Sequence, residues 1–545
     1  MSRTVIVGGV AGGMSCATRL RRLDETREII IIEKGPDVSF ANCGLPYYVS
    51  GEIKERSSLL VQTPQSLKAR FNLDVRVSSE VISVDSDQKT IEVKTDEDIY
   101  TLSYDQLVLS PGAKPFIPPL EGIETADNLF TLRNVPDVDK IVTAIEETKP
   151  KKAAVIGAGF IGLEMAESLA NRGVEVTIIE MAPHVLPTVD YEMAAFAHNE
   201  LVANGLTVLT ETSVVAIEDE GKSLVLATGE KIATDLIILS VGVRPENGLA
   251  EFAGIELGMR GGILVDEDYQ TSVKDIYAVG DAIIVKHQIT KEDTMIALAS
   301  PANRQGRQVA DILGGMKRKN KGSIGTAIVR VFNQAVASTG LTERQLQALN
   351  YEFKVVHIDG KNHAGYYPNA SMVFLKLLFN PTTGEIYGAQ AVGQDGADKR
   401  IDIIATAIKA GMTVDELPEL ELTYAPPFGS AKDVVNMAGY AALNIMEGVT
   451  DNIQLSELSE KRDSGAYLLD VRTPTEFEKG NIPGFVNLPL NELRERMTEL
   501  PKDKEIIVSC HSGQRSYIAS RMLVQNGYQV KNLDGSHLLY STVNG

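Results

Sequence analysis

Residues 4–13 read TVIVGGVAGG, a short apolar strand that runs directly into a glycine-rich turn. We expect a helix over Ala11–Leu23 and a second strand over Ile29–Glu33, which is the βαβ order of a parallel sheet. The pattern returns at Ala153–Ile156, where the turn GAGFIG and a helix lead into the strand Val176–Glu180. Because a nucleotide-binding unit is repeated, the sequence predicts two bound nucleotides.

Length and charge limit the classes of function. The 545 residues exceed a single domain, and three cysteines are too few for a disulfide framework, which points to a reducing compartment. The net charge of −20 repels nucleic acid phosphates and anionic membranes. No apolar run reaches the roughly 18 residues that a membrane span needs. We expect a cytoplasmic protein with no nucleic-acid or membrane partner and no metal site.

The first glycine turn, GGVAGG at residues 8–13, has the first and third glycines of a dinucleotide fingerprint, but Val10 replaces the second. Glu33 lies 20 residues beyond Gly13 and can accept a hydrogen bond from a ribose 2′-hydroxyl. The later stretch TSVKDIYAVGD at residues 271–281 ends in Asp281, an acceptor for a sugar-alcohol hydroxyl. It resembles the second flavin motif of the FAD-dependent pyridine nucleotide-disulfide oxidoreductases. The candidate FAD contacts are Gly8, Gly9, Val10, Ala11, Gly12, Gly13, Glu33, Lys34, Gly112 and Asp281.

The second glycine turn matches the fingerprint at all three glycines. Glu180 ends the following strand, where a carboxylate accepts from a free 2′-hydroxyl and repels a 2′-phosphate. We therefore expect NADH to be preferred, with NADPH possible. The candidate nicotinamide-nucleotide contacts are Gly157, Gly159, Phe160, Ile161, Gly162 and Glu180.

A single cysteine follows the first unit, in SFANCGLPYY at residues 39–48. Pro46 is consistent with a helix that begins there, and its amide dipoles would lower the pKa of the Cys43 thiol. Most reductases of this superfamily carry a Cys-x4-Cys pair, whereas Tyr48 stands at the second position. The stretch resembles the single-cysteine branch, which contains coenzyme A-disulfide reductases, NADH oxidases and NADH peroxidases. Val10 stands where the oxidases and peroxidases carry a histidine, so the resemblance favours the coenzyme A-disulfide reductases.

In so acidic a protein, an anionic ligand must meet a local basic patch. Arg19 and Arg22 lie three residues apart and share one face of the first helix, and arginine suits bidentate phosphate contacts. The resemblance implies that coenzyme A is contacted by Ser15, Arg19, Arg22, Ser39, Asn42, Asn303 and Lys432. Cys16, in the middle of the same helix, is predicted to be a core residue.

The segments HAGYYP at residues 363–368 and LTYAPP at residues 422–427 resemble the dimerisation domain of the same reductases. There, tyrosines of the partner subunit reach the catalytic cysteine as hydrogen-bond donors or proton sources. The resemblance implies a homodimer in which Tyr424 and either Tyr366 or Tyr367 fill these roles.

The C-terminal stretch LLDVRTPTEF at residues 468–477 resembles a rhodanese domain, with CHSGQR at Cys510–Arg515 as its catalytic loop. Inward-pointing loop amides make an anion nest, and His511 and Arg515 add positive potential that stabilises a thiolate or persulfide at Cys510. Related phosphatases use the longer Cys-x5-Arg loop, so the Cys-x4-Arg spacing favours sulfur transfer.

These features predict an α/β protein with two Rossmann-like nucleotide-binding domains, an α+β dimerisation domain and a C-terminal α/β rhodanese domain. The expected ranges are 1–150 with 271–320 for FAD, 151–270 for NADH, 321–447 for dimerisation and 451–545 for rhodanese. The expected activity is flavin-dependent NAD(P)H reduction of coenzyme A persulfide or polysulfide. Hydrosulfide is released through a mixed disulfide at Cys43, and Cys510 carries the sulfane sulfur. The alternatives are coenzyme A-disulfide reduction, NADH oxidase or peroxidase activity, and a non-enzymatic redox sensor.

Overall fold

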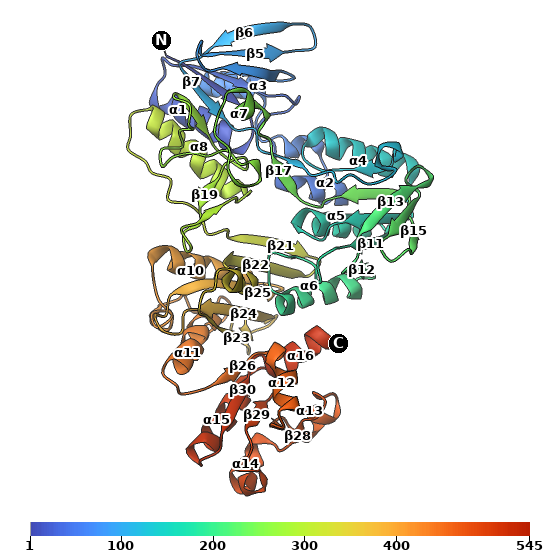
Figure 1. The fold of residues 1–545 in the computed structure, drawn as a ribbon, viewed down its shortest axis with the longest axis vertical. Helices are drawn as coiled ribbons and strands as arrows, with labels where there is room; N and C mark the ends of the chain where they lie inside the picture. The colour runs from blue at the N-terminus through green and yellow to red at the C-terminus, as the bar shows by residue number, and fades with distance from the viewer. Residues whose placement is uncertain (1) are drawn as a thin grey trace. The chain divides into compact units, whose positions relative to one another are not determined.

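The structure is a computed structural model that describes residues 2–545 (Figure 1). It consists of two compact units. The first contains Met1–Ala182 and Leu206–Gly325, and the second contains Pro183–Gly205 and Thr326–Gly545.

The first sheet of the first unit is parallel, with the strand order β18-β7-β1-β2-β3. The four isoleucine residues at the end of β2 are buried, as expected for a parallel sheet that is covered on both faces. Helix α1 has the bounds that the sequence predicts, and it packs along α8. These elements are β1 (Arg3–Val7), β2 (Glu28–Ile32), β3 (Asp74–Arg76), β7 (Gln106–Leu109), β18 (Ile276–Ala278), α1 (Ala11–Leu23) and α8 (Ala299–Leu313).

The second sheet repeats this arrangement, with the order β12-β11-β10-β16-β9 and parallel pairing throughout. Its glycine turn leads into helix α5 (Phe160–Asn171). The strands are β9 (Leu129–Phe130), β10 (Lys152–Ile156), β11 (Glu175–Ile179), β12 (Thr207–Leu209) and β16 (Leu236–Leu239). The repeat read from the sequence is therefore present, but β9 joins this sheet although it precedes residue 150.

Each nucleotide-type sheet is accompanied by a small antiparallel sheet of three strands, β4-β5-β6 in one case and β13-β14-β15 in the other. These strands are β4 (Glu80–Asp85), β5 (Thr90–Lys94), β6 (Ile99–Ser103), β13 (Val214–Glu218), β14 (Ser223–Leu226) and β15 (Lys231–Ala233).

The second unit is built on an antiparallel sheet of order β21-β22-β25-β24-β23, which leaves β23 as an edge strand. Helices α10 and α11 pack against it and form its apolar core. The elements are β21 (Ala327–Val331), β22 (Gln334–Gly340), β23 (Lys354–Lys361), β24 (Met372–Phe379), β25 (Ile386–Gly393), α9 (Glu343–Ala348), α10 (Ala397–Ala410) and α11 (Val434–Met446).

Helix α6 (Tyr191–Ala203) belongs to this second unit, although residues 151–270 were expected to form one nucleotide-binding domain. It contacts β21, β22 and β25, and Phe196 stacks on Phe374 of β24 with ring centroids 4.5 Å apart. The position of α6 is therefore set by the burial of its apolar side chains against this sheet, although α6 follows β11 in the sequence.

The C-terminal part is a parallel sheet of order β26-β30-β29-β27-β28. Strand β29 has the predicted bounds, and helix α15 starts two residues before the predicted Ser516. The elements are β26 (Asn452–Ile453), β27 (Tyr467–Asp470), β28 (Val486–Asn487), β29 (Ile506–Ser509), β30 (Val530–Leu533), α12 (Leu458–Asp463), α13 (Pro474–Glu478), α14 (Leu490–Arg496), α15 (Gln514–Gln525) and α16 (Ser536–Asn544).

Over residues 2–545, every helix is too short or too polar to cross a membrane.

Candidate active sites

Glu33 lies at the first glycine turn, directly after β2. Its carboxylate accepts a hydrogen bond from the Gly9 N–H at 2.7 Å. Gly8 has a φ of +99°, and a Cβ at this residue would lie 2.0 Å from the Ser110 carbonyl oxygen. A Cβ at Gly13 would lie 1.9 Å from the carbonyl oxygen of Gly8. Both positions therefore require glycine, one for the tight turn and one for close helix–strand packing.

Asp281 follows β18 at the carboxyl end of the same sheet, where ligands bind in open α/β sheets. Burial raises the pKa of its carboxyl, and the charge of Arg133 opposes that shift. Gly112 has a φ of +71°, and a Cβ there would meet nothing within 4 Å, so a ligand can approach the backbone. These residues fit a flavin dinucleotide. Lys34 instead pairs with Glu80 at 2.7 Å.

Glu180 takes the equivalent place at the second glycine turn, where it accepts from the Ala158 N–H at 2.7 Å. Gly157 has a φ of +101°, and a Cβ at Gly162 would lie 2.0 Å from the Gly157 carbonyl oxygen. Gly159 is the N-cap of α5, and a Cβ there would meet nothing within 4 Å. The helix N-terminus is thus open to a pyrophosphate, with Phe160 and Ile161 beginning the helix behind it.

Cys43 lies in a 3-10 turn, η1 (Asn42–Gly44), immediately before the six-residue helix α2 (Leu45–Ser50). The residue is exposed. Partial withdrawal of the thiol from water raises its pKa, and the carboxylates of Glu164 and Asp281 raise it further. The predicted lowering of this pKa is therefore wrong, because the loss of water around the thiol and the two carboxylates all favour the protonated form.

Glu164 is a residue that the sequence analysis missed. It accepts from the Tyr47 hydroxyl at 3.1 Å, and Ser168 donates to the Pro46 carbonyl at 2.8 Å. Helix α2 is thereby held on α5, so the turn that carries Cys43 rests on the helix of the second nucleotide motif. The signal was available, since Glu164 follows the fingerprint residue Gly162 by two positions.

The predicted coenzyme A contacts of the first unit gather on two neighbouring helices and at the Cys43 turn. Ser15 of α1 donates to Asn303 of α8 at 2.6 Å. Arg19 pairs with the buried Asp311 at 2.6 Å, so part of its charge is already balanced, whereas Arg22 is exposed. The other positions are Ser39, which has a φ of +48°, Asn42, which donates to the Arg133 carbonyl at 3.4 Å, and Lys432, an exposed residue of the second unit. Cys16 is fully buried, as predicted.

The tyrosine candidates lie in the second unit. The hydroxyls of Tyr366 and Tyr424 are 3.1 Å apart, and both side chains are well exposed. Tyr367 instead packs edge-on against His363, with ring centroids 5.7 Å apart. The structure therefore brings Tyr366, and not its neighbour, together with Tyr424.

Cys510 is buried at the end of β29. The Gly513 N–H donates to its Sγ at 3.1 Å, so one amide of the predicted anion nest points at the sulfur. Arg515 makes two hydrogen bonds to Glu476, at 2.7 and 2.8 Å. This pair lowers the pKa of Glu476 and raises that of Arg515. Much of the positive potential expected from Arg515 is therefore balanced within the protein.

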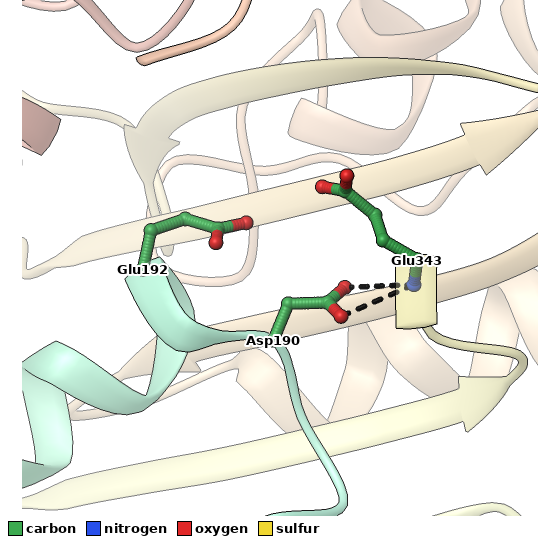
Figure 2. A group of neighbouring side chains, drawn as sticks. All are labelled: Asp190, Glu192 and Glu343. Atoms are coloured by element: carbon green, nitrogen blue, oxygen red, sulfur yellow. Dashed lines mark hydrogen bonds between the residues drawn. The ribbon is translucent and has the colours of Figure 1, made fainter. Parts of the chain in front are cut away.

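Asp190, Glu192 and Glu343 have the spacing of a metal site (Figure 2). The Lys376 ammonium, however, contacts all three carboxylates, at 2.8 Å from Asp190 and closer still to the other two. The positive charge that these carboxylates require is thus supplied by a side chain.

The chain has two dinucleotide-binding turns, and the exposed Cys43 lies near Asp281, the aspartate of the second flavin motif. These features define an oxidoreductase that binds two nucleotides. Residues 2–306 match the model of the pyridine nucleotide-disulphide oxidoreductases, residues 326–434 match the dimerisation domain of that family, and residues 454–540 match a rhodanese-like domain. The chain belongs to the pyridine nucleotide-disulphide oxidoreductase family, whose members use FAD and NAD(H). Its dimerisation domain indicates a homodimer.

Three similar proteins extend the comparison. The chain is 53% identical to reduced CoADR-RHD of Bacillus anthracis, with a TM-score of 0.98 and coverage of 100% of this chain and 98% of that one. It is 38% identical to an NAD-dependent persulfide reductase from A. fulgidus, with a TM-score of 0.94 and coverage of 99% and 100%. A coenzyme A disulfide reductase of Staphylococcus haemolyticus is 36% identical over 448 residues, which are 82% of this chain and 100% of the relative.

Proposed function

We propose that this protein is an NADH-dependent reductase of coenzyme A persulfide and polysulfide, and that its rhodanese domain carries the sulfane sulfur. The observation that carries the proposal is the placement of the three cysteines. Cys16 is buried in the first core and Cys43 is exposed, and both are free thiols, so Cys43 is not paired with the other cysteine of its unit. Cys510 lies in a loop whose amide already donates to its sulfur.

The chemistry follows from these two thiols. A persulfide at Cys510 passes its terminal sulfur to a coenzyme A thiolate, which gives coenzyme A persulfide and the Cys510 thiolate. The Cys43 thiolate then attacks the coenzyme A sulfur, and the bond to the terminal sulfur breaks to release hydrosulfide. The product is a mixed disulfide between Cys43 and coenzyme A.

FAD held at the first glycine turn, beside Glu33 and Asp281, would supply two-electron transfer from NADH, so that this disulfide is reduced to the Cys43 thiolate and coenzyme A thiol. The protein's own part is to place the nucleotides and the cysteine. Glu33 and Glu180 hold the two glycine turns, and the contacts from α5 to α2 fix the turn that carries Cys43.

Reduction of coenzyme A disulfide is the second candidate. Cys43 would attack that disulfide in the same way and release a coenzyme A thiolate in place of hydrosulfide. The full length of the staphylococcal relative aligns with 82% of this chain, which supports this activity for the part without rhodanese. Persulfide reduction ranks first because a fused rhodanese domain that carries sulfane sulfur would have no role in the reduction of coenzyme A disulfide. The similar persulfide reductase, which covers 99% of this chain, has the same arrangement.

The test compares NADH consumption with coenzyme A persulfide, coenzyme A disulfide and oxygen as acceptors. We expect turnover with the persulfide to be fastest, and turnover with oxygen to be slow. Cys43→Ser should abolish NADH-dependent turnover and spare sulfur transfer from thiosulfate to cyanide, whereas Cys510→Ser should do the reverse. A single flavin reduction without turnover would instead indicate a redox sensor, and survival of both activities in either variant would refute the division of labour.

A further inference from the structure

The loop that carries Cys510 is closed by residues 534–538, here called the closing segment. Three hydrogen bonds join them: Cys510 N–H donates to Ser536 Oγ at 3.2 Å, and the carbonyls of Cys510 and His511 accept from the amides of His537 and Leu538 at 3.2 and 2.8 Å. Because these bonds involve the backbone on both sides of the cysteine, a shift of the closing segment shifts the sulfur.

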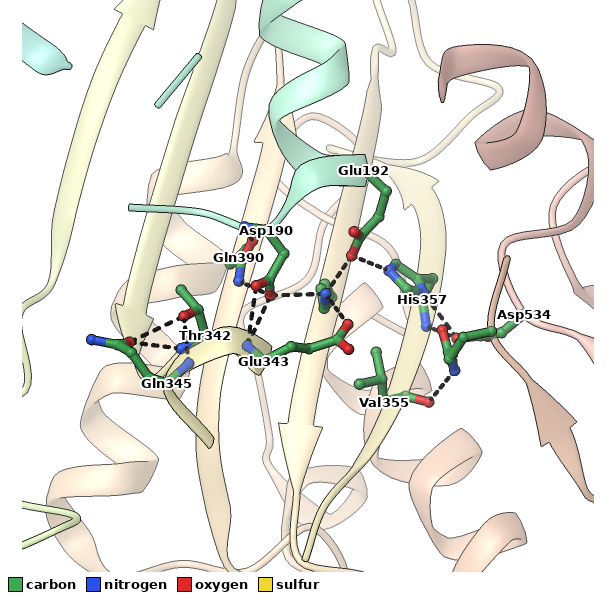
Figure 3. Close-up of polar contacts among 11 residues, drawn as sticks. Asp190, Glu192, Thr342, Glu343, Gln345, Val355, His357, Gln390 and Asp534 are labelled. Atoms are coloured by element: carbon green, nitrogen blue, oxygen red, sulfur yellow. Dashed lines mark hydrogen bonds and ion pairs between the residues drawn. The ribbon is translucent and has the colours of Figure 1, made fainter. Parts of the chain in front are cut away.

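The closing segment is in turn held by the dimerisation domain (Figure 3). Its first residue, Asp534, is buried and accepts two hydrogen bonds from His357 of the edge strand β23. The backbone N–H is at 3.0 Å and ring Nδ1 at 2.8 Å. Gln454 donates to Asp534 and to the Val355 carbonyl, both at 3.2 Å. Backbone groups that an edge strand would otherwise expose are thus capped by the rhodanese domain.

The other ring nitrogen of His357 contacts Glu192 of α6 at 3.3 Å. His357 therefore lies between two carboxylates, one from each domain. Although burial opposes the charge, these two carboxylates raise the pKa of His357 to about 9. A protonated imidazole donates from both nitrogens, so it can bridge both acids at neutral pH.

Glu192 continues the network into the dimerisation domain through an ion pair with Lys376 of β24. This lysine side chain is fully buried, and its other partners, Asp190 and Glu343, flank it. Charged contacts therefore lead from Lys376 through Glu192 and His357 to Asp534. From Asp534 the closing segment reaches the Cys510 loop through its neutral hydrogen bonds.

A second contact reaches the loop directly. Asp359 lies two residues beyond His357, so both side chains project from the same face of β23. Both line a small cavity together with Ser512 of the Cys510 loop. Burial raises the pKa of Asp359, while a hydrogen bond from Ser512 and the charge of His511 oppose that shift.

We propose that His357, with Asp359 beside it, is a positioning residue for sulfur transfer, because it holds Cys510 in its amide nest through the closing segment. The inference rests on the sulfur-carrying role proposed for Cys510. Small misplacements of reacting groups by distant residues can reduce rates by up to about a hundredfold. Loss of the His357 charge should therefore slow sulfur transfer without affecting the Cys43 centre.

The experiment uses the full-length, flavin-loaded protein and the variants His357→Gln and Asp359→Asn. Lys354→Gln is the matched control, since Lys354 is an exposed residue of the same strand. Sulfur transfer from thiosulfate to cyanide is measured beside NADH-dependent reduction of coenzyme A disulfide. The thiol pKa of Cys510 is obtained from the pH dependence of its alkylation by iodoacetamide, followed by peptide mass spectrometry.

We expect sulfur transfer to fall on the order of tenfold or more in His357→Gln. The thiol pKa of Cys510 should rise, and disulfide reduction should stay at the wild-type rate. Unchanged sulfur transfer and an unchanged Cys510 pKa in both variants would overturn the inference. If His357→Gln does not fold, the inference is tested with Asp359→Asn, again by sulfur transfer and by the thiol pKa of Cys510. Absence of sulfur transfer in the wild type would refute the proposed function instead, and the alkylation profile would still test the positioning role.

Discussion

Replacing Lys376 by Met tests the ionic network at its centre. The lysine side chain is fully buried and contacts three carboxylates, which are 8%, 17% and 26% exposed. Methionine has a similar length and fills the same volume, so the main change is the loss of the positive charge. The variant leaves Asp190, Glu192 and Glu343 facing one another.

Removing one partner of a buried ion pair costs about 3–5 kcal/mol. The remaining contacts place this case at the lower end. Asp190 keeps the Gln390 amide at 2.6 Å and the Glu343 N–H at 3.1 Å, and Glu192 keeps His357 at 3.3 Å. A loss of about 3 kcal/mol in a unit of this size corresponds to a fall in melting temperature of roughly 6–12 °C.

Differential scanning calorimetry of the flavin-loaded protein measures this shift. The double variant Lys376→Met with Glu343→Gln should recover part of the loss, because only two carboxylates then face each other without a lysine. The reasoning is refuted if Lys376→Met melts within about 2 °C of the wild type, or if the double variant is less stable than the single one.

The pH dependence of the stability difference between wild type and Lys376→Met tests the same cause independently. In the wild type, Lys376 and His357 hold the pKa of Glu192 well below its usual range. The contribution of Glu192 to the free energy of unfolding is therefore present above the pKa that this residue has in the unfolded chain. It is lost as the pH falls through the pKa that Glu192 has in the folded protein. In Lys376→Met the mutual repulsion of the carboxylates raises their pKa values, so protonation favours the folded state. The stability difference between wild type and variant should narrow from pH 7 to pH 5, and a constant or widening difference would contradict the assigned cause.

Two further predictions concern the second glycine turn. Gly162→Ala should abolish NADH-dependent turnover and spare flavin binding, because its Cβ would lie 2.0 Å from the Gly157 carbonyl oxygen; stopped-flow flavin reduction and the flavin spectrum measure the two effects. Glu180→Ala removes the acceptor of the Ala158 N–H and the proposed ribose contact, so kcat/KM for NADH should fall by about tenfold, while that for NADPH changes little. An equal fall with both nucleotides would show that Glu180 only supports the turn.

The parts of the fold that the sequence predicts well are those with local signals. Helix α1 has the expected bounds because an apolar run and glycines mark its start, and β29 has the expected bounds because charged residues precede it and the CHSGQR loop follows it. The four-part architecture is likewise confirmed, since each part carries its own motif. The placement of α6 was not predictable in this way, because it depends on packing against strands more than 120 residues later in the chain.

At the site, too, features with a local sequence signal were predicted, and features that depend on residues far away in the sequence were not. Spacing alone placed Glu33 and Glu180 beside the glycine turns, but not the hydrogen bonds that they accept from the turn amides; their ribose contacts stay a prediction. The pKa of Cys43 was predicted in the wrong direction because its causes are not visible in the local motif: the thiol is partly withdrawn from water, and the carboxylates of Glu164 and Asp281 lie more than 100 residues away in sequence. The contact between His357 and Asp534 spans 177 residues and has no motif at either end.

Buried ion pairs seldom add net stability over apolar residues of equal volume, so the network around Lys376 is better explained by the geometry that it imposes. An apolar contact would allow the rhodanese domain to slide along the edge strand β23. His357 prevents this sliding, because its Nδ1 is bonded to Asp534 and its Nε2 to Glu192. The series ends on a segment that is hydrogen-bonded to Cys510 itself. The dimerisation domain thus sets the position of a sulfur that belongs to another domain, and the Lys376 and His357 variants separate the stability of that arrangement from its effect on sulfur transfer.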